Sequence, residues 1–477
     1  MNVLFVVSEC VPFAKSGGLA DVAGSLPREL KKLGHEVRVL LPKYGTISPQ
    51  LIESAQKIAE FEVQLSWRRQ YCGIYEMEYE GIIYYFMDNE FYFHRPKLYE
   101  QYDDGERFAY FSKAAVETLY HIPFLPDIIH THDWHTGMIP FLLKTQHQNT
   151  KLANIKNVFT IHNLQFQGIY EKGFLGDVLG IHYDYFNPDQ LEFHGNVNFM
   201  KAALVYSDII TTVSPSYRDE IQTEYYGEHL DGLLRARNED FYGIVNGIDN
   251  KLYNPQTDTS IAGKYSNKNL NGKKKNKKQL QKQFGLPVDE QKPLMAVVSR
   301  LTAQKGFELV RGVFHEIMQE DVQLIILGTG DPKFEDFFRQ AAEWYPDKLS
   351  VHIGFNEDLA HQIYAGADMF LMPSKFEPCG LSQLIAMRYG TLPIVRETGG
   401  LRDTVQPYNE YTGSGNGFSF TNFNAHDMLY TIQRAISFYR KPKVWNKIVQ
   451  NSMKKDYSWA RSAAEYEKLY QGLIKEV

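Results

Sequence analysis

The chain has 477 residues, which is too long for one ordinary domain, so we expect two or three domains. Its 43% hydrophobic and 23% charged residues are typical of a globular protein, and its net charge of −6 disfavours nucleic acid and anionic membrane as partners. No apolar run approaches the roughly 20 residues of a membrane span. Three cysteines without a CxxC pair, and no signal-peptide pattern, predict a reducing, cytoplasmic location.

The first part of the chain predicts a βαβ unit followed by an aromatic region. Strands are expected at 3–7 and 36–41, and the helix between them ends at Gly34. We predict a further strand at 82–87 and an exposed aromatic loop at 88–105. Strands with the character of a parallel sheet then follow at 128–131, 158–161 and 209–213.

A second strand–helix alternation follows a Lys/Asn-rich segment, 264–278, which predicts a mobile surface loop. Strands are expected at 294–299, 323–327, 349–353, 369–372 and 392–395, and helices at 306–318, 332–343, 357–364 and 380–389. Three helices are expected at the end, at 425–440, 442–453 and 459–474. This pattern predicts an α/β chain of two doubly wound parallel sheets, with a boundary near 243 and a last helix that returns to the first domain.

Two similar glycine-containing segments follow strands in the two halves of the chain. The first, KSGGLADV, contains Gly17 and Gly18, and the second, ETGGLRDTV, contains Thr398, Gly399 and Gly400. Glycine lets the backbone turn sharply and approach a ligand, and backbone N–H groups ahead of a helix can bind an anion. Two such loops in two α/β patterns indicate twin domains that hold one phosphorylated ligand.

Two cations follow the strand predicted at 294–299. Arg300 and Lys305 suit a diphosphate, because each pair of unit charges at 4 Å contributes ~4 kcal/mol at an effective dielectric constant near 20. A solvated surface pair is the alternative.

A carboxylate and a thiol stand in the turn SKFEPCGL, ahead of a predicted helix. Glu377 could hydrogen-bond sugar hydroxyls and stabilise an oxocarbenium-like transition state, or it could simply cap the helix. Cys379 could gain thiolate character near a helix start, although packing is the commoner role of cysteine.

Histidines gather after two strands. Strand alternation places His130 and His132 of the segment HTHDWH on one face, and no HExxH or CxxC accompanies them, so we expect no metal site. His162 and Asn163 end another strand, where they fit sugar-hydroxyl recognition. A histidine satisfied within a turn is the alternative.

Aromatic residues offer two stacking surfaces. Tyr92 and Tyr99 in the loop FYFHRPKLY could stack on the pyranose rings of a long acceptor, and local core packing explains them equally well. Phe355 follows a strand at a place where a nucleotide base could stack, although a buried Phe is the usual case.

Together these segments resemble the bacterial glycogen synthases, the family that includes the plant starch synthases, over essentially the whole chain. The markers are KSGGLADV (15–22), HTHDWHTG (130–137), TIHN (160–163), VNGID (245–249), SRLTAQKG (299–306), SKFEPCGLSQ (374–383) and TGGLRDTV (398–405). The resemblance implies the GT-B fold, two Rossmann-like domains around a deep interdomain cleft. Residues 1–242 would form the acceptor-side domain and 243–456 the nucleotide-sugar domain, with 457–477 returning to the first.

The resemblance also implies an activity. The family transfers glucose, with retention and without metal or cofactor, from a nucleotide-sugar to the non-reducing end of an α-1,4-glucan such as glycogen or a maltooligosaccharide. ADP-glucose is the usual bacterial donor, and UDP-glucose stays open.

By the same resemblance, Lys15 contacts the donor, the Gly17–Gly18 amides meet its phosphates, and Asp21 supports their loop. Arg300 and Lys305 hold the diphosphate, Glu377 and His162 contact the transferred glucose, and Glu377 is the catalytic position. The substrate-binding set is completed by Asp133, Asn163, Asn246, Phe355, Cys379, Gly380, Leu381, Thr398, Gly399 and Gly400.

Two positions depart from relatives. Many retaining GT-B enzymes carry a second glutamate eight positions after the first, where this chain has Ile385, with Gln383 nearby. This difference favours the glycogen and starch synthase branch. Phe355 stands where many bacterial members have Tyr, which keeps stacking and removes a hydroxyl contact.

Three other functions are compatible with parts of the pattern. A glycoside hydrolase would need two carboxylates about 5–10 Å apart, and no such pair stands out. A nucleotide-sugar epimerase would not need aromatic residues for an acceptor. An inactive glucan-binding protein would not need the donor-site residues.

Overall fold

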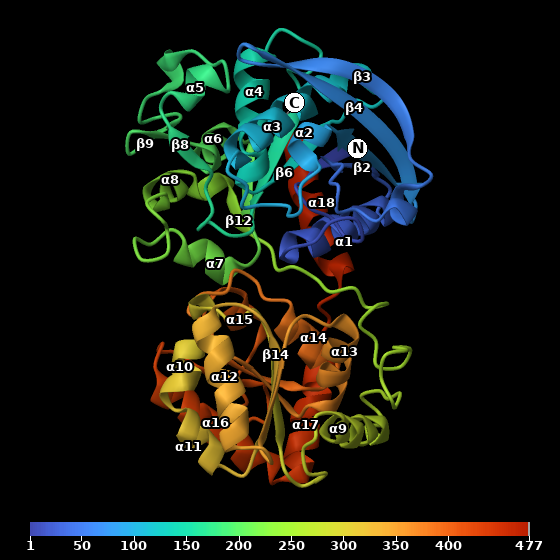
Figure 1. Cartoon of the computed structure of the whole chain (residues 1–477), viewed down its shortest axis with the longest axis vertical. Coiled ribbons are helices and arrows are strands. Elements are labelled where there is room, and N and C mark those ends of the chain that lie inside the picture. The colour runs from blue at the N-terminus through green and yellow to red at the C-terminus, as the bar shows by residue number, and fades with distance from the viewer. Residues whose placement is uncertain (476–477) are drawn as a thin grey trace. The chain divides into compact units, whose positions relative to one another are not determined.

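The computed structural model describes residues 1–475, and its contacts divide the chain into two compact units. The first unit contains Met1–Ile244 together with the C-terminal helix α18 (Trp459–Lys475), and the second contains Val245–Ser458. Helix α18 packs against helix α1 (Gly18–Lys32), the first helix of the chain (Figure 1). Both boundaries lie two residues from the positions predicted from the sequence.

The first unit is built on a nine-stranded sheet in the order β12-β11-β7-β6-β1-β2-β5-β4-β3. All neighbouring strands are parallel except the pairs β5–β4 and β4–β3. The strands are β1 (Asn2–Val6), β2 (Glu36–Pro42), β3 (Gln56–Leu65), β4 (Arg68–Tyr79), β5 (Ile82–Asp88), β6 (Ile128–His132), β7 (Lys156–Ile161), β11 (Ile209–Thr212) and β12 (Phe241–Gly243). Figure 1 shows β3 and β4 as a long curved pair at one edge.

Helices and a small second sheet complete the first unit. The helices are α2 (Glu90–Phe93), α3 (Asp104–His121), α4 (Met138–Gln146), α5 (Phe174–Asp177), α6 (Phe199–Tyr206), α7 (Pro215–Glu220) and α8 (Asp231–Ala236). Strands β8 (Ile169–Glu171), β9 (Glu192–Phe193) and β10 (Asn196–Asn198) pair antiparallel.

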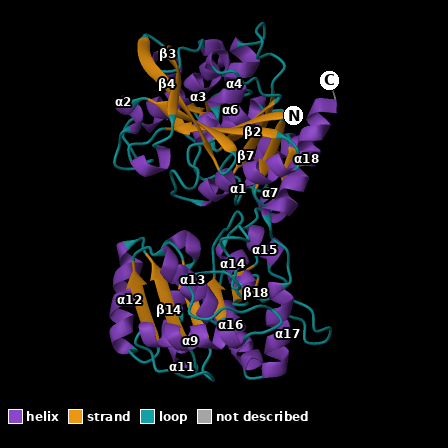
Figure 2. Cartoon of the chain, turned by 90° about the vertical axis from the view of Figure 1, so that its right-hand side faces the viewer, coloured by secondary structure: helices purple, strands orange, loops and turns teal. Residues whose placement is uncertain are grey.

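The second unit contains six parallel strands in the order β15-β14-β13-β16-β17-β18, with helices on both faces (Figure 2). The strands are β13 (Leu294–Val298), β14 (Gln323–Gly328), β15 (Leu349–Ile353), β16 (Met369–Met372), β17 (Leu392–Arg396) and β18 (Phe418–Phe420). The helices are α9 (Asn271–Gln283), α10 (Phe307–Gly312), α11 (Phe314–Gln319), α12 (Pro332–Trp344), α13 (Glu357–Gly366), α14 (Ser382–Arg388), α15 (Gly399–Thr404), α16 (Ala425–Tyr439) and α17 (Pro442–Met453).

The apolar runs become buried strands because a parallel sheet covered by helices on both faces excludes water from every residue. In β14, for example, all six residues are buried. Each predicted strand is present within two residues of its expected ends, and the predicted α/β class with two doubly wound sheets is confirmed. Among residues 1–475, no helix is long and apolar enough to cross a membrane.

The Lys/Asn-rich segment is the clearest correction. The predicted loop at 264–278 is wrong from residue 271 onward, where helix α9 begins. Lys273 and Lys277 are buried: Lys277 Nζ lies 2.7 Å from an oxygen of Asp368, and Lys273 Nζ donates to two carbonyls and a threonine hydroxyl. The many lysines and asparagines suggested a solvated loop. The structure buries two of the lysines because a long lysine side chain can pack its stem against apolar surface while its ammonium group reaches an acceptor.

The aromatic region is the second correction. Strands β3 and β4 were not predicted, and the expected loop contains the short helix α2. Phe91 and Tyr102 are exposed, whereas Tyr92 and Phe93 are completely buried. The prediction of an exposed loop is therefore wrong at Tyr92. The predicted helix at 306–318 is also divided in two, because Val313 leaves helical geometry between α10 and α11.

Candidate active site

In the first unit the polar residues gather at the carboxyl ends of neighbouring parallel strands, where ligands of such sheets bind. The glycine loop follows β1 and leads into α1, with Lys15 Nζ 2.7 Å from Oδ1 of Asp21. Asp21 thereby fixes the lysine at the rim of the loop. Lys15 keeps 42% of its side chain exposed and is accessible to a ligand.

A buried carboxylate that the sequence analysis missed supports the same loop. Oε2 of Glu9 accepts hydrogen bonds from the backbone amides of Ser16, at 2.5 Å, and Gly17, at 3.3 Å. Burial raises the pKa of Glu9. The amide of Gly17 is thus engaged with a side chain, which differs from its expected contact with a phosphate. A glutamate in the turn directly after β1 was the only available signal.

Asp133 connects the ends of β6 and β7. Its Oδ1 accepts hydrogen bonds from the backbone amides of His162, at 2.7 Å, and Asn163, at 3.5 Å. Asp133 has a positive φ of 55°, a conformation that is uncommon for residues other than glycine and is concentrated at functional sites. Burial raises its pKa to about 7. The structure therefore brings together residues that were predicted from two separate motifs.

The histidines of this edge form a stack. Nδ1 of His132 lies 3.0 Å from Nε2 of His162, and the rings of His130 and His132 stack with centroids 4.2 Å apart. Burial lowers the pKa of His162 to about 3 and those of the other two well below the usual value, so all three rings are neutral near pH 7. Within residues 1–475, no group of three or more His, Cys, Asp or Glu side chains is arranged to hold a metal ion.

The two predicted acceptor tyrosines have different environments. Tyr92 is completely buried and its hydroxyl donates to Glu106 at 2.6 Å, so its ring packs in the core and presents no face to a sugar. Tyr99 is half-buried, with its hydroxyl 2.7 Å from that of Ser8 and its ring stacked on His135. The core-packing alternative therefore holds for Tyr92.

In the second unit a buried ion pair joins two neighbouring strand ends. Lys305 follows β13 and Glu377 follows β16, and Lys305 Nζ lies 2.6 Å from Oε2 of Glu377. The hydroxyl of Ser374 donates to the same oxygen at 2.9 Å, and Glu377 is only 5% exposed. The simple surface-pair alternative therefore fails for Lys305. Arg300 is exposed at the end of β13.

The second glycine loop packs directly on the turn that carries Glu377. Gly399 has a φ of 45°, and a Cβ there would lie 2.0 Å from the carbonyl oxygen of Glu377. The amide of Gly400 donates to that same carbonyl at 3.1 Å. Buried Thr398 precedes the pair as the residue before α15. Glycine is required here because two backbone segments touch.

Hydrogen bonds from Gln383 support the turn that carries Glu377. Gln383, which lies near the position of the absent second glutamate, donates through Nε2 to the carbonyls of Cys379 and Gly380. Gly380 has a φ of 72°. Burial raises the pKa of the Cys379 thiol to about 12, which rules out thiolate character. Leu381 is half-buried just before α14.

Asn246 and Phe355 have contrasting environments. Asn246 is 5% exposed, and its Oδ1 is buried without a hydrogen-bond partner among the described residues. Phe355 is 78% exposed two residues after β15, so the expectation of a buried ring is wrong and a stacking surface is present.

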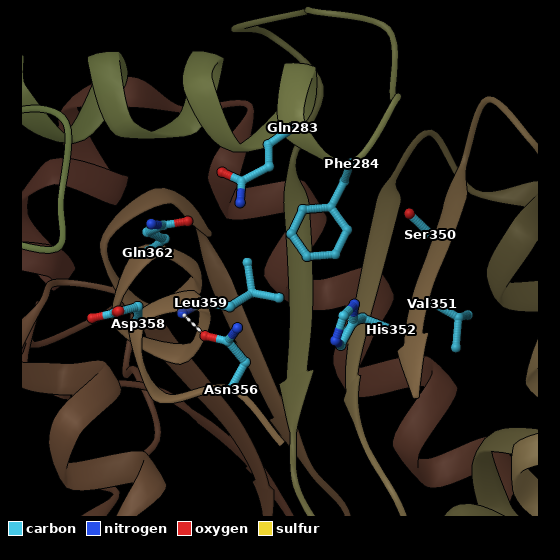
Figure 3. Close-up of a pocket in the computed structure, with 9 residues that line it drawn as sticks. All are labelled: Gln283, Phe284, Ser350, Val351, His352, Asn356, Asp358, Leu359 and Gln362. Atoms are coloured by element: carbon cyan, nitrogen blue, oxygen red, sulfur yellow. Dashed lines mark hydrogen bonds between the residues drawn. The ribbon is translucent and has the colours of Figure 1, made fainter. Parts of the chain in front are cut away.

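The second unit also contains a pocket beside β15. It has a volume of about 450 Å³ and is lined by the end of α9, by β15 and by the start of α13, including Phe284, His352 and Gln362 (Figure 3). None of the site residues predicted from the sequence lines it. The strand-end chemistry, and not this pocket, defines the candidate active site.

Comparison with known proteins decides the family. Residues 2–236 match the profile described as starch synthase catalytic domain, and residues 277–452 match glycosyl transferases group 1. The chain is 62% identical over 477 residues to a glycogen synthase of Geobacillus thermodenitrificans, covering 100% of this chain and 98% of the relative. It is 59% identical over 476 residues to a glycogen synthase of Bacillus cereus, covering 100% of both chains.

The chain belongs to the glycogen and starch synthase family. It is therefore a glycosyltransferase, an enzyme that transfers glucosyl units.

Solved structures agree with the family assignment. The catalytic domain of starch synthase IV from Arabidopsis thaliana, bound to ADP and acarbose, matches with a TM-score of 0.93 and 34% identity over 99% of both chains. A sucrose-phosphate synthase from Thermosynechococcus elongatus matches with a TM-score of 0.63 and 18% identity over the whole of both chains, which supports the fold alone. The predicted GT-B class is confirmed.

Proposed function

We propose that this enzyme transfers glucose from ADP-glucose to the non-reducing end of an α-1,4-glucan, with retention of configuration. UDP-glucose remains the alternative donor. The observation that carries the proposal is the buried Glu377 carboxylate, held by Lys305 and Ser374 at the end of β16 in a chain of this family. The Arabidopsis structure, which binds ADP and acarbose, supports an adenine nucleotide and a glucan-like acceptor.

The donor diphosphate is assigned to the second unit. Arg300 and Lys305 supply fixed positive charge at the end of β13, and the charge that develops on the leaving diphosphate is stabilised most by groups already in place. The exposed ring of Phe355 offers its face to the nucleotide base. The contact of the Gly399–Gly400 loop with the backbone of Glu377 supports the turn that holds this carboxylate beside Lys305.

Glu377 is assigned the catalytic role at the glucosyl carbon. Its carboxylate stabilises the positive charge of an oxocarbenium-like state, while Lys305, bonded to the same carboxylate, faces the departing phosphate. Attack by the acceptor hydroxyl on the face that the nucleotide leaves gives retention. Preorganised charges and exclusion of water would lower the barrier by about 8–23 kcal/mol, the range typical of enzymes.

The sugar is assigned to hydrogen-bonding groups of the first unit. His162, Asp133 and Asn163 lie together at the ends of β6 and β7, in an arrangement that fits a ring of hydroxyls. Lys15 is assigned to the donor, and Tyr99, but not the buried Tyr92, is kept as a candidate acceptor contact.

We place this reaction in the cytoplasm. Cys10, Cys72 and Cys379 are all buried free thiols, which persist in a reducing compartment.

The test is nucleotide release from ADP-glucose and from UDP-glucose, each with and without glycogen. ADP release that requires glycogen is the expected result. Release without an acceptor would indicate a hydrolase or an epimerase, and no release from either donor would indicate a glucan-binding protein or a different sugar. Anomeric configuration of the new bond, followed by NMR, tests retention.

A matched pair of variants tests the diphosphate assignment. Arg300→Ala should lower kcat about 10²-fold or more, the effect of losing one donor to a developing negative charge. Arg311→Ala removes an exposed arginine of α10 that has no assigned role and should leave kcat unchanged. Equal activity of the two variants would refute the role of Arg300.

A further inference from the structure

We propose that His132 is a positioning residue that fixes the tautomer of His162, so that Nδ1 of His162 presents an N–H donor to the sugar. The inference rests on the proposed function, in which His162 contacts the transferred glucose. It adds a residue with no role in that proposal, and it specifies which atom of His162 carries the proton.

The two rings are held by neighbouring strands. His132 is the last residue of β6, and His162 directly follows β7, with 3.0 Å between Nδ1 of His132 and Nε2 of His162. His132 is completely buried against the rings of His130, at 4.2 Å, and Phe5, at 5.4 Å, which also contact each other at 4.8 Å. Its backbone amide donates to the hydroxyl of Thr136. These contacts restrict rotation of the His132 ring.

Both rings are neutral, so one proton occupies the contact between them. Burial lowers the pKa of His132 well below the usual value and that of His162 to about 3. A neutral imidazole carries one N–H and one lone pair. The bond is therefore donated either by Nδ1 of His132 or by Nε2 of His162.

The other nitrogen of His132 selects between these two cases. Nε2 of His132 is buried without a hydrogen-bond partner among the described residues. If His162 donated, the proton of His132 would stand on Nε2 as a buried, unpaired N–H, an arrangement that is rare in folded proteins. If His132 donates from Nδ1, only a lone pair is left there. The second case is favoured, and it places the His162 proton on Nδ1.

This tautomer determines what His162 offers to a ligand. His162 is half-buried, and its Nδ1 makes no hydrogen bond to the described part of the chain. A fixed N–H at that atom can donate to a sugar oxygen, whereas a lone pair there could only accept. Orientation of one imidazole by a hydrogen bond to its other nitrogen is the device by which histidine sites are commonly set.

The C-terminal helix α18 forms a hydrogen bond to His130, which stacks on His132. Nδ1 of His130 lies 2.6 Å from the hydroxyl of Tyr470 in α18, and Nε2 lies 2.6 Å from Oγ1 of Thr160. With both nitrogens engaged, the His130 ring cannot rotate, and it supports the face of His132. The return of α18 to the first unit thus contributes to the geometry of the sugar site.

Two substitutions of His132 separate its hydrogen bond from its packing. His132→Phe keeps a flat ring in the stack and removes the donor, and should lower kcat about 10- to 100-fold, as loss of a supporting hydrogen bond to a site histidine does. The KM for the nucleotide-sugar should stay unchanged. His132→Asn places an amide N–H near the position of Nδ1 and should restore most of kcat. His147→Phe, at a half-buried histidine outside the stack, is the control.

The tautomer itself is measured by ¹⁵N NMR of the histidine-labelled full-length enzyme, with His162 assigned from a His162→Asn sample. We expect the Nδ1–H form in the wild type and its loss in His132→Phe. An Nε2–H form in the wild type, or full kcat in His132→Phe, would overturn the inference. If no nucleotide is released by the wild type, the proposed function fails, and the NMR result still decides the tautomer.

Discussion

Replacement of Asp133 by Asn is expected to stabilise the first unit at pH 8 but not at pH 4. Burial raises the pKa of this carboxyl to about 7 from its ordinary value of 3.8. The folded protein therefore binds the proton more tightly than the unfolded chain does. The contribution of Asp133 to stability is fully present below pH 3.8 and is lost as the pH rises through about 7.

The size of this effect follows from the two pKa values. Each pKa unit corresponds to about 1.4 kcal/mol. At pH 8 the ionised carboxylate therefore lowers the free energy of unfolding by at most about 4 kcal/mol. Asn keeps the shape and an oxygen that can accept from the amides of His162 and Asn163. It also tolerates the positive φ at this position better than most residues do. The substitution thus removes the charge and retains the turn.

Calorimetric melting at pH 4 and pH 8 measures the difference, because it resolves separate transitions in a chain of two units. The transition of the first unit should rise by as much as about 8 °C at pH 8, with about 2 °C for each kcal/mol. It should be unchanged at pH 4. Equal shifts at both pH values, or a lower melting temperature at pH 8, would refute the reasoning.

Asp177 provides a control of opposite sign within the same unit. Hydrogen bonds from Trp67 and Arg68 lower the pKa of its carboxyl. The stability that Asp177 contributes is present above the unfolded pKa and is lost as the pH falls through the lower folded value. Asp177→Asn should therefore lower the melting temperature at pH 8. A shift in the same direction as Asp133→Asn would indicate a general effect of removing charge.

Two further predictions concern the second unit. Lys277→Met should destabilise this unit by about 3–5 kcal/mol in urea unfolding, because it leaves Asp368 buried without its cation, whereas the exposed neighbour Lys278→Met should have no measurable effect. Gly399→Ala should abolish transferase activity, because a Cβ 2.0 Å from the carbonyl of Glu377 must displace the turn that carries the proposed catalytic carboxylate. An active Gly399→Ala enzyme would show that the loop is not tied to the turn.

The sequence predicts most of the two sheets because these strands are short, nearly continuous apolar runs, as expected in a parallel sheet covered on both faces. It fails where burial depends on partners far along the chain. Lys277 appears solvated until Asp368, 91 residues later, is placed beside it. Strands β3 and β4 were not predicted because many of their side chains are exposed, so their sequences lack a continuous apolar run.

In the candidate site, too, the sequence predicts individual residues but not the contacts between residues far apart in the chain. Motif spacing predicts that Asp133 and His162 matter, but not that the carboxylate of one accepts from the amide of the other, since that contact depends on the order of β6 and β7 in the sheet. Glu9 went unnoticed because a lone glutamate after a strand has no distinctive spacing. Tyr92 was assigned to an acceptor surface because composition alone cannot distinguish a core ring from an exposed one.

The charges of the two units indicate a division of labour in the proposed reaction. In the first unit Lys15 is paired with Asp21, burial raises the pKa values of Glu9 and Asp133 and so disfavours their charged forms, and the buried histidines are neutral near pH 7. In the second unit Lys305 pairs with the buried carboxylate of Glu377, and Arg300 adds an exposed cation at the end of β13. A diphosphate is attracted by an excess of cations, whereas sugar hydroxyls need neutral donors and acceptors at fixed positions. Raised salt should therefore weaken binding of the nucleotide much more than binding of the glucan.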